Sequence, residues 1–561
     1  MRLDLEELRP EEHSWFSPNV EYHGTGRADF AEGRGSAEGE VTIVFDEFGG
    51  DKIEMEVKRL TGPEPQPKGI SELIASRRFP EPGGGVILFH GFHNNPCVKL
   101  VVDTDAGVFS IVGPIDYDVR SGEGCDRISM HPRISEFVCR EGGRPKYWIL
   151  PLLNFVSDFS WAPEALSNHP LRVFRTPAIP DGLPEEEALK AFLYANSRNH
   201  LIAFTFGGSL GFIEPLADYA DREAKLRGGS VRRLVTAVVV GEVGENSTEV
   251  KSLESWFPHD MLRVLSFATG IEVGAPWIEF RDESSRLVRR VHAVHNAADL
   301  TEGHRTIREG IHRGTGRLLT CFLSSQSPSR SYVGIAMYHA VRAWRCSTHS
   351  IEEKLIYVVR GLECLCARLS APEPELRMRL GPTKRALVAE ILNDAARRIR
   401  SLATSPRTSA EQEENSALCE IATRASTTPW GKAGAFGLAV VDLLNKFGLA
   451  DGIVLDTYFA STPVPGTATE NWASWLSRAR GEPIHGGFFD IASGDFRIED
   501  LVSLARHLHD VLVRIILRVV NYDGTYQPTV FPGAVQATVD WVKPSTPASH
   551  LGYGQYPENE A

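Results

Sequence analysis

Hydrophobic and polar residues alternate along much of the first half of the chain, which is the period expected of β-strands with one buried face. Apolar side chains occupy every second position in residues 41–45 and again in 53–57. Segments 98–112 and 136–150 each place turn residues between two apolar runs, so both are predicted to be β-hairpins. Further predicted elements are buried strands at 201–206 and 232–243, a helix at 249–266 and a hairpin at 277–294.

Beyond about residue 300 the apolar spacing changes to three or four residues, the period of amphipathic helices. Residues 351–369 carry one apolar stripe and residues 498–519 carry another. Ser409 with Gln412 matches the capping box that begins a helix. Segment 315–331, rich in Ser and Gly, is the expected linker before these helices. The remaining predicted helices are 332–345, 384–402, 433–449 and 467–479.

These patterns predict an α+β fold in two unlike parts. A β-rich domain should occupy residues 1–320, an all-α helical bundle residues 330–525, and a loosely packed tail residues 526–561. The length of 561 residues suits more than one domain. A content of 42% hydrophobic and 24% charged residues excludes a chain that is disordered throughout.

The net charge of −13 is unevenly distributed, because residues 1–330 carry −11 and residues 331–530 carry none. A polyanion such as RNA should therefore be repelled by the first part and tolerated by the second. The acidic start lacks a signal-peptide pattern and no run of about 18 apolar residues occurs, so we expect a soluble cytoplasmic protein without membrane contact. Eight scattered cysteines without paired Cys/His spacing predict neither disulfides nor a metal or other cofactor.

The most informative chemistry lies in the turn before the last predicted helix. Arg480 and His485 stand there with four residues between them, followed by Gly486 and Gly487. A guanidinium can bind phosphate oxygens in a bidentate manner, and an imidazole transfers protons at neutral pH. The two glycines allow a phosphate to approach the backbone closely. Arg478, with six residues before His485, fits the same pattern, so the choice of arginine stays open.

An R-x4-6-H motif before the last long helix of an α-bundle resembles the HEPN superfamily. The whole chain most resembles the ApeA-like HEPN proteins of bacteria, which place a large β-rich domain before such a bundle. The segments that carry the closer resemblance are 211–243, 351–369, 478–487 and the end of the last helix through residue 526. This resemblance implies metal-independent RNA cleavage, association into homodimers or larger oligomers through the HEPN domain, and defence against phage by abortive infection.

Carried over to this chain, the resemblance implies that Arg480 stabilises the charged phosphorane and that His485 acts as general base or acid. RNA would be the substrate, with tRNA as one candidate, and the first domain would respond to a phage-derived or small-molecule trigger. One departure is that the residue after the motif arginine is commonly polar, whereas here it is Gly481, and Pro483 stiffens the turn. The alternative is a non-catalytic HEPN protein that dimerises or binds nucleotides.

A competing pattern suggests a serine hydrolase. Residues 207–211 read G-x-S-x-G after a predicted strand, as in a nucleophile elbow. His90 could belong to an oxyanion loop, and Ser209, Asp456 and His485 follow the chain order of that class. The predicted bundle between Ser209 and His485 leaves no βα units to carry such a triad. We therefore favour a hairpin turn at these glycines.

Three other patterns have simpler interpretations. His90 with His93, and the four histidines between 292 and 312, lack the companions of a metal site. Arg305 and His312 repeat the R-x6-H spacing away from the last helix, which indicates a chance match. The basic run at 397–400 favours a solvated helix face over an RNA-binding one.

Overall fold

In the computed structural model the described residues are 11–12, 17–30, 36–45, 51–61, 87–90, 97–122, 125–131, 134–175, 184–190, 200–243, 257–295, 300, 303–307, 313–345, 350–369, 381–403, 408–427, 435–449, 498–529 and 537–538, with single-residue gaps at 18, 142, 168, 185 and 326. The chain divides into two compact units by its internal contacts. The first comprises Met1–Thr348, Leu517–Pro528 and Gly533–Val539, and the second His349–Ile516, Thr529–Pro532 and Asp540–Ala561.

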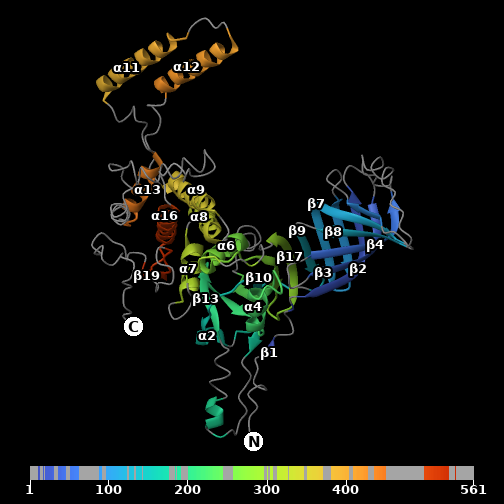
Figure 1. The fold of residues 1–561 in the computed structure, drawn as a ribbon. Helices are drawn as coiled ribbons and strands as arrows, with labels where there is room; N and C mark the ends of the chain where they lie inside the picture. Colours follow the sequence, from blue (N-terminus) through green and yellow to red (C-terminus); the bar gives the residue numbers. More distant parts are fainter. Residues whose placement is uncertain are drawn as a thin grey trace. The chain divides into compact units, whose positions relative to one another are not determined.

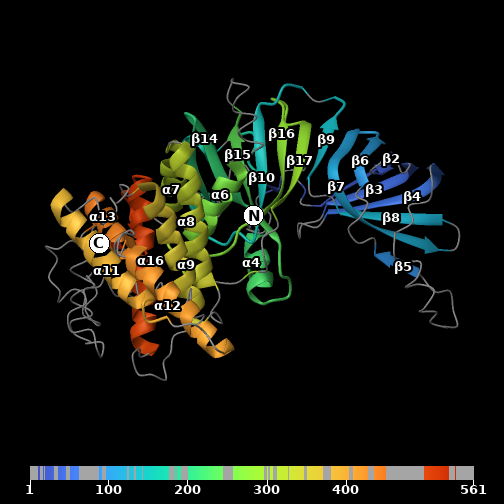
Figure 2. The same cartoon turned by 90° about the horizontal axis from the view of Figure 1, so that it is seen from above.

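The first unit is built on one large antiparallel sheet (Figures 1 and 2). In spatial order its strands are β11 (Ser160–Trp161), β13 (His200–Phe206), β14 (Ser209–Pro215), β15 (Val235–Glu242), β10 (Tyr147–Leu153), β16 (Ala275–Arg281), β17 (Leu287–His295), β9 (Ile134–Cys139), β7 (Gly107–Gly122), β6 (Cys97–Thr104), β2 (Val20–Phe30), β3 (Ser36–Phe45), β4 (Asp51–Thr61) and β8 (Cys125–His131), with β5 (Ile87–His90) paired to β7. Two short pairs, β1 (Glu11–Glu12) with β12 (Phe174–Arg175) and β18 (Thr525–Tyr526) with β19 (Ala537–Thr538), stand apart from it.

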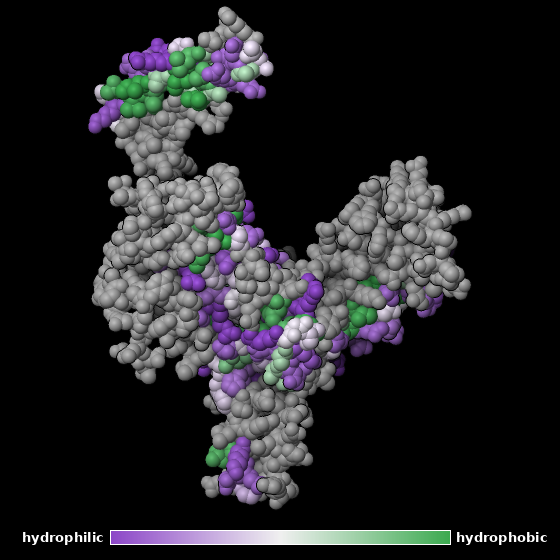
Figure 3. Space-filling model, viewed as in Figure 1, coloured by the Kyte–Doolittle hydropathy of each residue, from purple (hydrophilic) through white to green (hydrophobic). Residues whose placement is uncertain are grey.

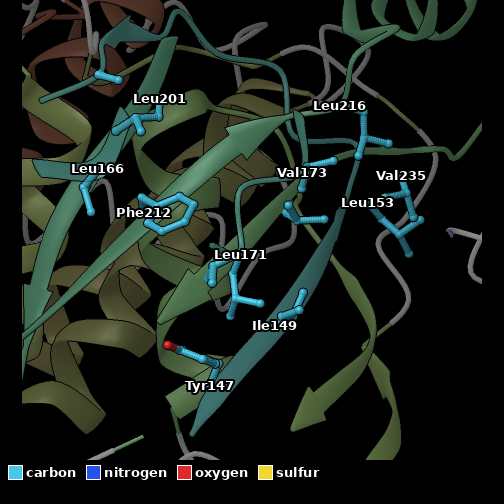
Figure 4. Close-up of a cluster of buried hydrophobic side chains, with 13 residues drawn as sticks. Tyr147, Ile149, Leu153, Leu166, Leu171, Val173, Leu201, Phe212, Leu216 and Val235 are labelled. Atoms are coloured by element: carbon cyan, nitrogen blue, oxygen red, sulfur yellow. The ribbon is translucent and has the colours of Figure 1, made fainter. Parts of the chain in front are cut away.

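Burial differs between the two ends of this sheet. Along β3 buried positions alternate with more exposed ones, and the inward side chains of β2, β3, β4, β6 and β7 form one hydrophobic cluster. All seven residues of β10 and all seven of β16 are buried, so both faces of the sheet are covered there. On one face, Leu171 and Val173 pack among Ile149 and Phe212 (Figure 4).

The hairpins predicted at 98–112 and 277–294 are confirmed, since β6 pairs with β7 and β16 with β17. The hairpin predicted at 136–150 is wrong. β9 pairs with β7 and β17, whereas β10 pairs with β15 and β16. The β16–β17 hairpin therefore lies between β9 and β10, because strand pairing is decided by long-range packing rather than by the local turn.

The segment predicted as a linker is helical instead. α7 (Gly314–Ser324) packs on β13, and α8 (Ser327–Arg345) packs on α6 (Phe257–Thr269). Leu318, Leu319 and Phe322 are completely buried. Gly316 is needed because a Cβ atom there would lie 2.1 Å from the carbonyl oxygen of Ala203. The Ser and Gly content thus reflects close helix–strand packing, and the division into two units follows α8 rather than preceding it.

The second unit is helical. Its described helices are α9 (Ile351–Leu369), α11 (Pro382–Arg400), α12 (Ser409–Thr427), α13 (Ala435–Lys446) and α16 (Ile498–Val519), whose last residues from Leu517 belong to the first unit. Thr408, not Ser409, caps α12 by accepting a hydrogen bond from the backbone N–H of Glu411 at 3.2 Å. A reciprocal capping box at Ser350 and Glu353 begins α9.

The observed architecture confirms the α+β fold class, with the sheet in the first part of the chain and helices predominating from residue 314. No helix among the described residues is long and apolar enough to span a membrane. The predicted tail is packed at its beginning, because Tyr526 is 0% and Thr529 3% exposed. A content of Pro, Gly and Tyr therefore does not mean loose packing at the start of this segment.

Candidate functional site

The residues predicted to form the site lie outside the described part of the chain, in segment 450–497. They comprise Arg478, Arg480, His485, Gly486 and Gly487, together with Gly481, Pro483 and Asp456. The predicted helix at 467–479 lies there too. Their roles stay predictions, and the described chemistry begins with the helix that follows them.

That helix, α16, carries a row of three polar side chains, two of which are buried. His507, Asp510 and Arg514 are three and four residues apart and therefore share one face of the helix. Asp510 is 5% exposed and Arg514 1%. Charged groups leave water at such a cost only where other polar groups compensate them. Asp510 and Arg514 thus make this part of the helix an internal polar surface of the second unit.

Two imidazoles belong to this helix. Burial lowers the pKa of His507 to about 4, so its ring is neutral at pH 7. His509 is 2% exposed, and its Nδ1 lies 3.2 Å from the hydroxyl oxygen of Thr529. That hydroxyl donates to the carbonyl oxygen of Arg506 at 3.1 Å. The residues after α16 therefore return to bind its middle turns.

These side chains are better suited to stabilising the helix and its surroundings than to contacting a polyanion directly. A neutral imidazole offers phosphate no positive charge, and a pKa near 4 makes His507 a weak base at pH 7. Arg514 is too buried for an RNA backbone to reach it from solvent. The sequence analysis missed these residues. Their signal was a set of polar side chains at spacing i, i+3 and i+7 within an otherwise apolar helix.

A second buried cluster lies in the sheet of the first unit. Glu279, 1% exposed, accepts hydrogen bonds from the indole N–H of Trp277 at 3.1 Å, from Arg281 at 2.7 Å and from Nε of Arg290 at 2.9 Å. Arg290 also donates to the hydroxyl of Tyr22 on β2 at 2.7 Å. Burial alone would raise the pKa of Glu279, but the charges of Arg290 and Arg281 outweigh it and lower the pKa to about 2.

A third buried charge pair joins Arg172 to Glu214, with both side chains 0% exposed and 2.8 Å between Nη2 and Oε1. The second oxygen of Glu214 accepts the backbone N–H of Val173 at 2.7 Å. This carboxylate fixes the segment before β12 to β14. In both clusters of the first unit the charges are compensated by protein groups, which indicates a structural role.

The G-x-S-x-G segment is a hairpin turn, as its interpretation from sequence predicted. Phe206 of β13 pairs with Ser209 of β14, and the two residues between them, Gly207 and Gly208, have φ of 57° and 86°. Two consecutive positive φ angles are typical of a type I′ turn. No helix follows Ser209 to build a nucleophile elbow, and His90 belongs to β5, which pairs with β7 elsewhere in the sheet.

Of the remaining candidates, His304 and Arg305 have structural partners, while His93 and His312 lie outside the described residues. Nε2 of His304 is 2.7 Å from the carbonyl oxygen of Gln527, and burial lowers its pKa. Arg305 binds Asp158 at 2.9 Å, while its motif partner His312 is not described. Within the described residues no group of three His, Cys, Asp or Glu side chains could hold a metal ion.

The basic run of α11 is solvated, since the side chains of Arg397 and Arg398 are 72% and 82% exposed and both approach Asp394. This agrees with the interpretation favoured from the sequence.

Comparison with protein-family models, with curated proteins and with solved structures found no match to this chain.

Proposed function

We propose that this protein is a metal-independent endoribonuclease of anti-phage defence, with Arg480 and His485 as its catalytic residues. The observation that carries the proposal is the combination of motif and helix. The R-x4-H spacing precedes a long helix, α16, that forms at Ile498–Val519 within a helical unit. Asp510 and Arg514 on this helix are 5% and 1% exposed, so this part of the helix belongs to the packed interior of the unit.

In the proposed reaction Arg480 binds the non-bridging oxygens of the scissile phosphate and stabilises the negative charge of the phosphorane. His485 removes the proton of the 2′-hydroxyl, or protonates the leaving 5′-oxygen. The bond from the 2′-oxygen to phosphorus forms as the bond to the 5′-oxygen breaks. The products are a 2′,3′-cyclic phosphate and a 5′-hydroxyl. A motif from a second copy supplies the other proton transfer.

Arg478, Gly486 and Gly487 would contact the phosphate backbone, and tRNA is one candidate substrate. The charge distribution supports binding of RNA at the second unit, because residues 1–330 carry −11 and residues 331–530 are neutral overall. In the proposal the β-rich part responds to a phage-derived or small-molecule trigger, and the protein acts in the cytoplasm. The trigger can shift the equilibrium only through different affinities for the quiet and active arrangements.

Gly481 and Pro483 favour a second candidate, a non-catalytic protein whose helical part dimerises or binds nucleotides. The two candidates differ in one measurable respect. An enzyme leaves new 5′-hydroxyl ends, whereas a binding protein leaves the RNA intact. A serine hydrolase is not proposed, because Ser209 is the first residue of β14, directly after a two-residue hairpin turn with no helix behind it.

The test compares purified full-length wild type with His485→Ala and Arg480→Ala by sequencing RNA 5′-hydroxyl ends. Each variant should lose about 10² to 10⁴ in cleavage rate, the usual effect of removing one acid–base or charge-stabilising group. Matched controls are Arg397→Ala and His23→Ala, whose side chains are 72% and 70% exposed. Cleavage by His485→Ala at the wild-type rate would refute the assignment, and RNA bound without cleavage would support the second candidate.

A further inference from the structure

The helices α11 and α12 form an antiparallel hairpin. They pack along small residues, with Ala396 2% and Ala422 0% exposed. The loop between them is short, because α11 ends at Arg400 and α12 begins at Ser409. The two helices therefore contact each other along one side, the seam, while many residues on their other sides are exposed.

One flank of this hairpin is apolar and exposed. On α11, Leu387 and Ile391 are each 57% exposed and lie one turn apart. On α12, Ile421 is 53% exposed, and Ala417 precedes it by one turn and is also exposed. Relative to the contact between the two antiparallel helices, these apolar positions of α11 and α12 lie on the same side of the hairpin. They also lie at similar heights along the helix axes. Figure 3 shows hydrophobic surface gathered over both helices.

The hairpin is also electrically self-complementary. α11 carries five basic and two acidic residues, whereas α12 carries one basic and four acidic residues. Along the apolar flank the charges lie toward the loop, with Arg398 on α11 and Glu413 and Glu414 on α12. A second copy of the hairpin can be related to the first by a two-fold axis that runs parallel to the helices. In this arrangement each α11 faces the partner's α12. Apolar positions then meet apolar positions, and Arg398 approaches the partner's Glu413.

We propose that this flank is a homodimerisation surface, on which the same hairpin of a second copy docks to form an antiparallel four-helix bundle. A two-fold interface requires a surface that complements itself, and opposite charges on the two helices provide this. RNA would be attracted to α11 but repelled by α12, and it would leave the apolar flank uncovered. The inference concerns a different surface from the R-x4-H motif and does not depend on cleavage.

The first test measures the mass of the full-length protein by light scattering and sedimentation, without RNA. Wild type should be a dimer at micromolar concentration, and Leu387→Asp/Ile391→Asp should be a monomer with unchanged helix content by circular dichroism. The matched control, Ala386→Asp/Asn393→Asp, adds the same charge at exposed positions of the opposite flank and should stay dimeric. A wild type that is monomeric, or a double variant that stays dimeric, overturns the proposal.

The second test separates pairing between copies from docking of the hairpin on its own chain. Arg398→Glu and Glu413→Arg/Glu414→Arg each place like charges across the two-fold axis, so each variant alone should dimerise about tenfold more weakly. Mixed together, they restore both opposite-charge contacts, and a heterodimer should form with near wild-type affinity. Absence of this preference for the mixed dimer would refute the arrangement, because docking within one chain cannot produce it.

Discussion

Replacing Glu279 with Gln should destabilise the first unit strongly. The carboxylate neutralises Arg281 and Arg290 in the interior of the sheet, and its pKa falls from its usual 4.5 to about 2. A shift of this size corresponds to a contribution of about 3 kcal/mol to the free energy of unfolding at pH 7. The substitution also leaves two guanidinium groups buried beside a neutral amide, which raises the expected loss to about 3 to 5 kcal/mol.

Hydrogen exchange followed by mass spectrometry measures this loss locally, which matters because a chain with two units need not unfold in one step. The slowest amides of β16 and β17 should exchange about 100-fold faster in Glu279→Gln than in wild type, as a loss of about 3 kcal/mol implies. The control is Glu136→Gln on β9. Glu136 forms an ion pair with Arg289, but these side chains are 36% and 30% exposed, so at most about 1 kcal/mol should be lost.

The same carboxylate predicts a dependence on pH. Because the pKa of Glu279 is depressed in the folded protein, its contribution is complete above the unfolded value of 4.5 and disappears as pH falls toward 2. Wild type should therefore lose protection in β16 and β17 over this range, while Glu279→Gln should change less. Equal acid sensitivity of the two proteins, or equal exchange in Glu279→Gln and Glu136→Gln, would show that the network does not stabilise the sheet.

Two further outcomes are expected. Gly316→Val should lower the unfolding temperature sharply, because its Cβ would overlap the carbonyl oxygen of Ala203, whereas Gly381→Ala, with no atom within 4 Å of the added Cβ, should have little effect in the same calorimetric scan. RNA cleavage should continue in EDTA, since the proposed site uses Arg480 rather than a cation. Loss of cleavage on chelation, with recovery on adding Mg²⁺ or Mn²⁺, would contradict that mechanism.

Elements defined by local pattern could be predicted from the sequence. Residues 351–369 and 498–519 form α9 and α16 with the predicted bounds, because one apolar stripe decides both the helix and its buried face. The turn at Gly207 and Gly208 was predictable for the same reason, since two glycines between apolar runs favour positive φ. These choices depend on neighbours within a few residues.

Features that depend on distant residues could not be predicted. Nothing near β10 indicates that β15 and β16, not β9, pair with it. The sequence of α7 predicts a linker, because the contact that requires Gly316 lies more than a hundred residues away, at Ala203 of β13. Of the candidate site, the motif was visible in the sequence, but the buried partners of α16 were not, since a polar side chain in a helix looks the same in sequence whether it is solvated or enclosed.

The end of α16 offers a test of whether the first unit affects the proposed catalytic turn. From Leu517 the helix belongs to the first unit, where Asp523 binds Arg317 at 2.7 Å and the backbone N–H of Gln527 donates to Thr306 at 2.8 Å. Tyr526 in the same segment is completely buried. Its replacement by Ala should cost about 3 to 5 kcal/mol, as for other buried aromatic side chains.

Hydrogen exchange should report the change in α7 and in residues 303–307, and RNA cleavage should change with it if the helix transmits the trigger. Asp523→Ala is the matched control, because its ion pair with Arg317 is 66% and 49% exposed and contributes little. If Tyr526→Ala loosens only residues 520–528 and leaves both α7 and cleavage unchanged, the end of the helix is a passive anchor. A change in cleavage without a change in exchange would place the effect outside this segment. Only a joint change in both measurements supports a helix that carries the state of the first unit to the motif.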